Sequence, residues 1–116
     1  MFADPQSVTI NEVPISLPRV IVGTQDATYR NADETVQVRI SHLAAKGRKR
    51  RMVRLDQTVV AEDPLTAENV SQKAGVYIVI DEPDFGFTDE DLSNLVLALS
   101  AFLSEAAIAQ ILGGES

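Results

Sequence analysis

The chain has 116 residues and a formal net charge of −7, from 10 Lys and Arg against 17 Asp and Glu. This length indicates one domain, and a hydrophobic content of 45% is typical of a globular protein, not a disordered one. With no cysteine, one histidine and no apolar run near the roughly 20 residues of a membrane span, the sequence excludes disulfides and cysteine catalysis, and it disfavours a zinc site and a transmembrane helix.

The first strands are expected around an N-terminal turn. The stretch "SVTINEVPISLPRVIV" offers two short strands on either side of Asn11 and Glu12, and we assign residues 1–22 to this hairpin. Pro14 and Pro18 cannot donate to a β-ladder, which places the hairpin at a sheet edge or in an irregular arm. Another short strand is predicted at "ATYR", because the "NADE" that follows is rich in turn-forming residues.

The clearest pair of strands lies at the centre of the chain. Apolar and polar residues alternate in "TVQVRISHL", residues 35–43, and again in "RKRRMVRL", residues 48–55. Period-two alternation places the two sets on opposite faces of a sheet. The intervening "AAKG" is short enough for a hairpin turn, with Gly47 supplying the unusual backbone angle. These strands should therefore be antiparallel neighbours.

The last strand of the sheet is predicted after a long connection. Residues 57–72 read as a loop with room for a short strand at its start. The alternating "KAGVYIVIDEP" that follows indicates a strong strand, and Pro83 ends it. The main sheet is thus expected within residues 27–82, interrupted by a loop at about 57–72.

Residues 88–112 contain no Gly or Pro and predict helix. Thr88 can cap the first turn, with Asp91 reaching back in a capping box. Apolar residues then recur at helical spacing, and a second apolar set falls roughly 150° around the axis from the first. Either the helix bends near Ser104 and Glu105, or a straight helix has apolar contacts on two sides. The two sets are Leu92, Leu95, Val96, Leu99, Phe102 and Leu103, and then Ile108, Ile111 and Leu112.

This order of elements predicts an α+β fold, with an antiparallel sheet followed by one or two helices. A helix of about four turns is only ~25 Å long and ~10 Å wide, too narrow to cover a sheet of about five strands. We therefore expect a dimer in which the helices of each chain help to cover the partner's sheet. The nine apolar helix residues form the predicted dimer core.

Positive charge is concentrated in one segment. Six of the ten basic residues lie between Lys46 and Arg54. Alternation places part of this charge on the sheet face opposite the helices, together with Tyr77 from the last strand. Arginine forks bind phosphates and a tyrosine ring stacks on an unpaired base, as in sheet platforms that hold RNA. The alternative is a solvated hairpin tip, where Lys and Arg keep strand edges soluble.

The acidic and histidine residues do not indicate an active site. The segment "DEPDFGFTDED" lacks the ligand spacing of an EF-hand, and its last three acids suit a helix N-terminus. Asp81 and Glu82 have no partnered nucleophile or base, and His42 falls on the apolar face by its parity. No phosphate-binding loop is present. We predict no catalytic residue, metal, cofactor or small-molecule substrate.

The chain resembles the coat proteins of single-stranded RNA bacteriophages, the leviviruses, over essentially its whole length. The resemblance rests on the length, the opening "MFADPQSVTI", the central hairpin of "VQVRISH" and "RKRRMVRLD", the strand "YIVIDEP" and the helical C-terminal stretch. It implies one domain, residues 1–116, with an N-terminal β-hairpin, a five-stranded antiparallel sheet and two C-terminal helices. It also implies an interlocked dimer with a continuous ten-stranded sheet.

For function, the resemblance implies a virion capsid protein. Dimers would assemble in the bacterial host cytoplasm into an icosahedral shell, usually of 180 chains, with the connection around residues 60–72 meeting neighbouring subunits. In such proteins the inner sheet face contacts genomic RNA, and in several of them a dimer binds one RNA hairpin and represses replicase translation. Carried onto this sequence, the RNA-facing positions are Arg39, Ser41, Arg50, Met52, Arg54, Tyr77, Val79 and Asp81, with Lys46, Arg48 and Lys49 near the hairpin tip.

Two of these positions depart from the family pattern. Met52 and Val79 are apolar where family members use polar side chains to hold flipped adenines. General packaging of RNA is therefore favoured over recognition of one hairpin. The alternative function is a non-viral dimeric module that binds RNA on the same sheet platform without forming a shell.

Overall fold

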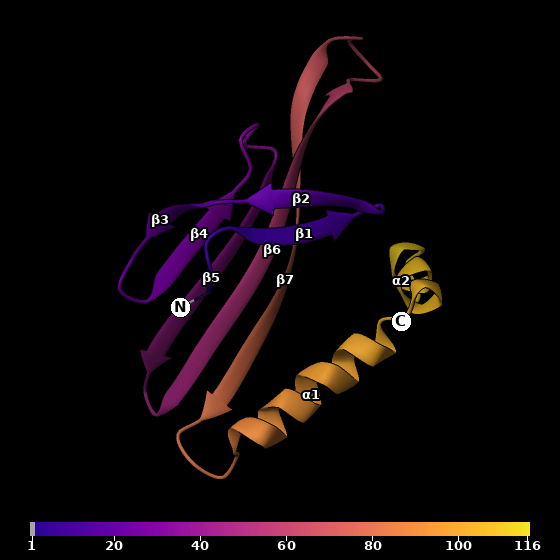
Figure 1. Ribbon diagram of the computed structural model, residues 1–116. Coiled ribbons are helices and arrows are strands. Elements are labelled where there is room, and N and C mark those ends of the chain that lie inside the picture. Colours follow the sequence, from indigo (N-terminus) through magenta and orange to yellow (C-terminus); the bar gives the residue numbers. More distant parts are fainter. Residues whose placement is uncertain (1) are drawn as a thin grey trace.

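Strands precede helices along the whole chain, as the sequence predicts. The computed structural model describes residues 2–116. A two-stranded sheet is followed by a five-stranded antiparallel sheet in the order β3-β4-β5-β6-β7 and then by two helices (Figure 1), which confirms the predicted α+β fold. The elements are β1 (Gln6–Ile10), β2 (Val13–Leu17), β3 (Arg19–Val22), β4 (Asp26–Arg30), β5 (Val36–Ala45), β6 (Arg48–Glu62), β7 (Asn69–Pro83), α1 (Asp89–Phe102) and α2 (Glu105–Leu112).

Two tight turns define the hairpins that the sequence predicts. Asn11 and Glu12 join β1 to β2 with φ of 50° and 65°, and Lys46 and Gly47 join β5 to β6 with φ of 49° and 75°. Positive φ at both loop residues is the two-residue geometry whose twist matches that of the flanking strands. Both turns therefore hold their strands in antiparallel register without a bulge.

The N-terminal hairpin crosses one face of the main sheet (Figure 1). Leu17 of β2 is buried there with three residues of β4 and β5, and the hairpin's Val8, Ile10 and Ile15 pack around them. This small cluster is the core of the single chain within residues 2–116. The buried sheet residues are Ala27, Tyr29 and Val36.

Residues 19–22 belong to the main sheet and not to the N-terminal hairpin. This segment is β3, which pairs with β4 through Arg19–Tyr29 and Val22–Ala27. The assignment of residues 1–22 to the hairpin was thus too long. Pro18 lies between the two sheets, and its carbonyl accepts a hydrogen bond from the backbone N–H of Arg30 at 3.0 Å. That bond turns the chain from the hairpin into the sheet.

The predicted long loop at about 57–72 was also wrong. The β6 and β7 strands pair continuously from Arg48–Pro83 to Glu62–Asn69, so only residues 63–68 connect them. Several β-branched residues lie in the extended part, which favours strand. Asp63 closes the short connection, because its backbone N–H donates to the Glu68 carbonyl and its carboxylate accepts from the Leu65 N–H, both at 2.8 Å.

The helices begin and bend where the sequence indicates. The Asp91 N–H donates to Thr88 Oγ1 and the Thr88 N–H donates to Asp91 Oδ2, each at 3.1 Å, which completes the predicted capping box. Ser104 caps α2 by accepting from the Ala107 N–H at 3.2 Å. The angle between α1 and α2 is 72°, which confirms the prediction that the helical segment bends near Ser104 and Glu105. Neither helix alone is long and apolar enough to cross a membrane. Only the two helices taken together reach that length and composition, and they are bent at the break between them.

The single chain leaves its helices largely uncovered. No residue of α1 or α2 is buried, and Figure 1 shows α1 leading away from the sheet. The radius of gyration is 17.1 Å, whereas a compact chain of this length has about 13 Å. The nine residues of the predicted dimer core are therefore exposed or half-buried in the single chain.

Candidate nucleic-acid interface

Cross-strand pairing brings the eight predicted RNA-facing residues to one face of the main sheet. Directly paired residues of antiparallel strands point to the same side. Three successive rows run across β5, β6 and β7 on the side opposite the N-terminal hairpin. We call these rows together the basic face. They are Arg39–Arg54–Tyr77, Ser41–Met52–Val79 and Leu43–Arg50–Asp81.

The residues near the hairpin tip divide between the two faces. Arg48 lies on the basic face, where its Nε is 3.1 Å from Asp81 Oδ1. Lys49 is in the next row, between Ala44 and Glu82, and that row belongs to the opposite face. Lys46 lies in the turn itself. Of these three predicted residues, the pairing thus joins only Arg48 to the basic face.

The basic face extends further than sequence reasoning placed it. Arg30 and Gln37 lie in the row beyond Arg39, and both Arg30 Nε and Nη2 donate to Gln37 Oε1, at 3.1 and 3.0 Å. Lys73 pairs with Thr58 further along β7 on the same side. Continuing the period-two alternation back along β7 from Tyr77 would have found Lys73, whereas the position of Arg30 depends on the register between β4 and β5.

Most arginines of this face are matched with an acid of the same chain. Arg39 Nη2 lies 2.8 Å from Asp26 Oδ2, and Arg54 Nε lies 2.8 Å from Asp56 Oδ1. Arg50 makes no ion pair with any residue in the described part of the chain. Exposed ion pairs contribute little free energy and exchange partners readily, so most of these arginines stay accessible to another anion.

Arg54 and Tyr77 form the aromatic part of the face. The Arg54 Cζ lies 5.5 Å from the centre of the Tyr77 ring, and the ring is exposed. The hydrogen bond and charge of Asp56 raise the pKa of Arg54 above its ordinary value. The guanidinium is therefore a permanent cation beside an accessible ring.

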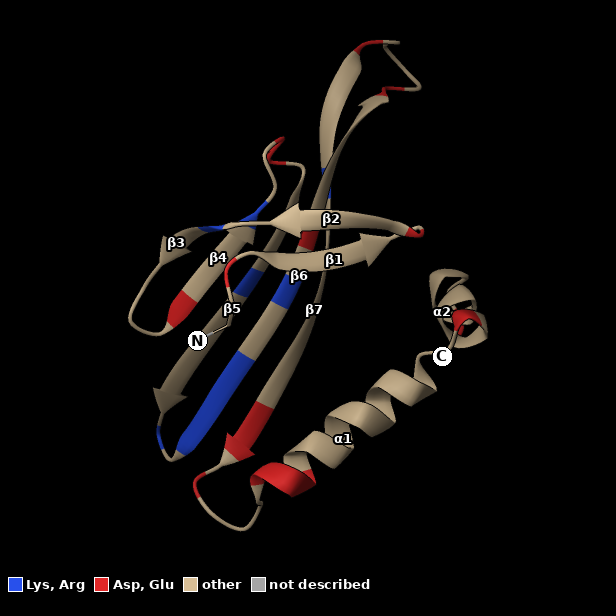
Figure 2. Ribbon diagram, viewed as in Figure 1, with Lys and Arg blue, Asp and Glu red and all other residues tan. Residues whose placement is uncertain are grey.

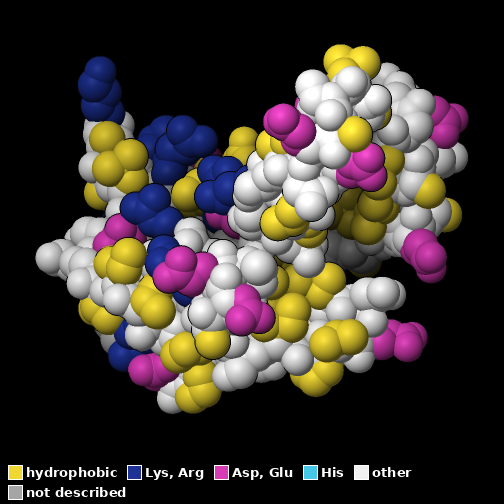
Figure 3. Space-filling view, turned by 90° about the horizontal axis from the view of Figure 1, so that it is seen from above, with side chains coloured by type: hydrophobic (Ala, Val, Ile, Leu, Met, Phe, Trp, Pro, Cys, Tyr) yellow, Lys and Arg dark blue, Asp and Glu magenta, His cyan; other side chains and the backbone are white. Residues whose placement is uncertain are grey.

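Charge is unevenly distributed over the whole molecule. Figure 2 shows Lys and Arg concentrated along β6, whereas α1 and α2 contain acids and no base. In the space-filling view, the basic side chains gather on one side of the molecule (Figure 3). Such an arrangement directs a polyanion to one surface of an acidic protein.

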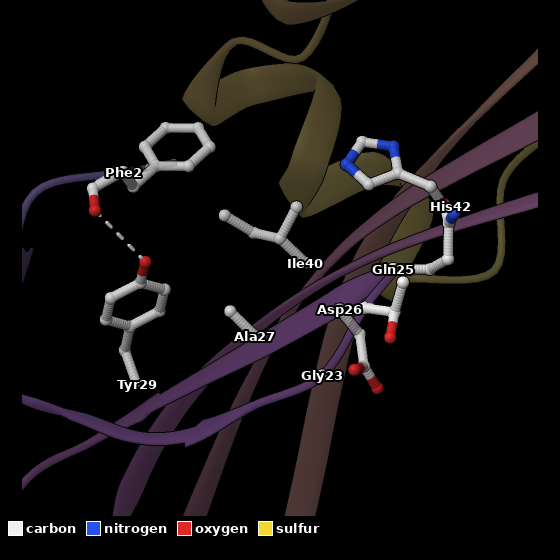
Figure 4. Close-up of a pocket in the computed structure, with 9 residues that line it drawn as sticks. Phe2, Gly23, Gln25, Asp26, Ala27, Tyr29, Ile40 and His42 are labelled. Carbon is white, nitrogen blue, oxygen red and sulfur yellow. Dashed lines mark hydrogen bonds between the residues drawn. The ribbon is translucent and has the colours of Figure 1, made fainter.

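The opposite sheet face carries a cavity of about 490 Å³ near the β3–β4 turn. Phe2, Tyr29, Ile40 and His42 line it, and the Tyr29 hydroxyl donates to the Phe2 carbonyl at 3.4 Å (Figure 4). His42 lies on this face, as its parity predicts, and its Nδ1 is 3.3 Å from Arg51 Nη1. The lining is mainly apolar and aromatic, which suits contact with another apolar surface.

Comparison with known proteins identifies the family. Residues 3–83, well over half of the chain, match the family model described as phage phiCb5, coat protein. The chain belongs to this coat-protein family. A search of curated proteins finds no match to the chain. Membership of this family makes the chain a structural capsid protein and not an enzyme, as the sequence predicts.

Solved structures share the fold of this coat protein at low sequence identity. The virus-like particle of bacteriophage AVE019 has a TM-score of 0.83 at 14% identity, over 98% of this chain and 97% of that chain. The particle of Beihai levi-like virus 21 has a TM-score of 0.74 at 12% identity, over 100% and 98%. An unassembled bacteriophage coat-protein dimer, described as RNA-binding, has a TM-score of 0.64 at 16% identity, over 97% and 95%.

These structures cover the helices as well as the sheet, so the likeness extends beyond the residues of the family match. The resemblance to coat proteins of RNA bacteriophages is therefore confirmed at the level of family and fold.

Proposed function

We propose that this coat protein dimerises, assembles into an icosahedral shell and packages single-stranded genomic RNA against the basic face. The observation that carries the proposal is the two-sided character of the sheet. One side gathers arginines and an exposed tyrosine, and the other side and the helices carry apolar surface that the single chain leaves uncovered.

Dimerisation is supported by the free edge of β7. This 15-residue strand ends the order of the main sheet, and along its length it pairs only with β6 among the described strands. A long unpaired edge is a template for another strand. Antiparallel pairing with β7 of a second copy has a two-fold axis perpendicular to the sheet, so it produces ten strands with both basic faces on the same side.

The helices supply the second part of this interface. Val76 on β7 is 72% exposed on the face opposite the basic one, and the described part of the chain does not cover it. Since α1 leads away from its own sheet, we place α1 and α2 over the partner's apolar face and its cavity. The nine apolar helix residues then form the dimer core.

Contacts between dimers are assigned to the tip of the β6–β7 hairpin. The tip projects beyond the other strands (Figure 1), and Val60 and Leu65 are among its most exposed apolar side chains. Exposed apolar residues on a projecting loop fit contact with neighbouring subunits. Assembly in the host cytoplasm and a shell of 180 chains belong to the same proposal.

RNA binding combines phosphate contacts with base stacking. Arg50 and Lys73 offer charge to phosphates, and Tyr77 offers a ring to an unpaired base. Met52 and Val79 are direct neighbours in the middle of the face and provide no side-chain hydrogen bond that strongly selects a base. This favours packaging of RNA in general over repression of the replicase gene through one hairpin.

The test is to express the chain alone and to size the soluble product, before and after nuclease, by light scattering and electron microscopy. Uniform particles with nuclease-protected RNA are expected. With no Trp and two Tyr, strong absorbance at 260 nm can come only from nucleic acid. A dimer that binds RNA but forms no particle with added RNA would contradict the shell. Empty particles that never take up RNA would contradict packaging.

A further inference from the structure

Asp56 occupies an unexpected position on the basic face. Its side chain is only 5% exposed, whereas the other acids that pair with arginines there, Asp26, Glu34 and Asp81, are 32%, 73% and 50% exposed. A carboxylate weakens the attraction of this surface for a polyanion, and its burial costs solvation free energy. Neither property helps RNA binding directly, so any contribution of Asp56 to RNA binding comes through the side chain to which it is hydrogen-bonded.

Asp56 holds Arg54 by one specific nitrogen. Its Oδ1 accepts from Arg54 Nε at 2.8 Å, so the hydrogen bond uses the inner edge of the guanidinium. The two terminal nitrogens make no hydrogen bond to any residue among 2–116. They form the fork that binds a phosphate in bidentate geometry.

Gly75 provides the space for this pair. It lies directly across from Asp56 on β7. A Cβ at residue 75 would collide with Asp56 Oδ1 and lie 3.1 Å from Arg54 Nη2. Gly75 is not among the residues with positive φ, so its backbone conformation does not demand glycine. Its role is to leave room for the Asp56–Arg54 pair above the strand.

Tyr77 completes the arrangement. It is the direct cross-strand partner of Arg54, and its exposed ring lies beside the guanidinium, with the 5.5 Å separation already described. Fixing a flexible arginine before binding reduces the conformational entropy that is lost when a ligand orders it. The fork and the ring are therefore neighbours that can contact the phosphate and the base of one strand together.

We propose that Asp56 and Gly75 are positioning residues that hold Arg54 beside Tyr77 to form a subsite for one unpaired nucleotide, with phosphate on Arg54 and base on Tyr77. This inference rests on the proposed RNA-binding function of the basic face. A positioning role and a purely electrostatic role predict opposite effects of removing Asp56 on RNA affinity. If charge alone matters, loss of the acid strengthens binding, whereas loss of a positioning residue weakens it.

The experiment compares the coat protein with four variants, after removal of nucleic acid and in its unassembled form. Each binds a short single-stranded RNA and an abasic strand of the same length and charge. For Asp56→Ala we expect affinity for the RNA to fall on the order of tenfold, the effect of one stacked base. Affinity for the abasic strand should stay equal or rise.

Two variants separate position from charge. Asp56→Asn keeps an oxygen that accepts from Arg54 Nε, so it should bind RNA at least as tightly as the original chain. Gly75→Ala leaves the charge unchanged but displaces the pair, and it should lose affinity for RNA and not for the abasic strand. Asp26→Ala, which removes a half-buried acid of the same face, is the control and should bind both strands more tightly.

The outcomes distinguish this inference from the proposed function. One outcome is that the original chain binds RNA, Asp56→Ala binds more tightly, as Asp26→Ala does, and Gly75→Ala binds unchanged. This outcome would refute the positioning role and leave the proposed RNA binding intact. If the original chain binds no RNA, both fail together. If Asp56→Ala does not fold, Gly75→Ala and Asp56→Asn decide the question.

Discussion

The arginines and lysines of β6 are not equivalent, although they are adjacent in the sequence. Arg50 lies on the basic face, across from Leu43 and Asp81, and the Asp81 carboxylate already pairs with Arg48. Lys49 is next to it along the strand but points to the opposite face. Within the described chain, Arg50 is thus a cation whose charge no acid offsets by an ion pair.

We therefore expect Arg50→Ala to weaken RNA binding and to reduce its salt dependence. Loss of one phosphate contact lowers the slope of log affinity against log salt by about 0.7 for a single strand. Titrations of RNA at several salt concentrations measure this slope. Lys49→Ala is the matched control, with the same change of charge one residue away, and its slope should change less. Equal slopes for the two variants would contradict the assignment of faces.

Alternation predicted which residues share a face, but not what their side chains contact. Period two follows from the backbone, so Arg54 and Tyr77 could be placed together from the sequence. The ion pair between Arg54 and Asp56 joins residues two apart on one strand, and it depends on the direction of two flexible side chains. The space above Gly75 likewise depends on the register between β6 and β7, which a single sequence does not specify.

At the scale of elements, local signals were the most reliable guide. The capping box of α1 was predicted because Thr88 and Asp91 act within one turn. The segment after Leu55 was mistaken for a loop, since its strand character comes from pairing with β7 and not from strict alternation. The segment after Pro18 was assigned to the wrong sheet, because nothing local to β3 indicates its partner β4.

The capping of α1 gives a prediction at this scale. Thr88→Ala removes the acceptor for the Asp91 N–H, and loss of such a cap costs about 1 kcal/mol of unfolding free energy. Urea unfolding at a fixed protein concentration measures the loss. Ser100→Ala, at an exposed position within the same helix, should leave stability within a few tenths of a kcal/mol. A neutral Thr88→Ala would show that α1 does not need its capping box.

At the scale of the molecule, the chain has more apolar surface than it can bury alone. The core of the described residues is a small cluster under the N-terminal hairpin, while the apolar stripe of α1 has no cover. A short helix that leaves its own sheet gains stability only from a second surface. Folding and association of this coat protein are therefore expected to be coupled, so stability should rise with protein concentration.

Leu99→Asp tests this coupling. Leu99 is 47% exposed in the single chain, so a charge there would cost an isolated chain little. In the proposed dimer the same charge is buried without a partner, at a cost of several kcal/mol, and the soluble dimer should disappear. Light scattering and circular dichroism measure mass and folding. Asn94→Asp adds the same charge to the opposite side of α1 and should leave the dimer intact. A folded, dimeric Leu99→Asp chain would show that the stripe of α1 faces solvent in the assembly, and the helices would have to be placed elsewhere.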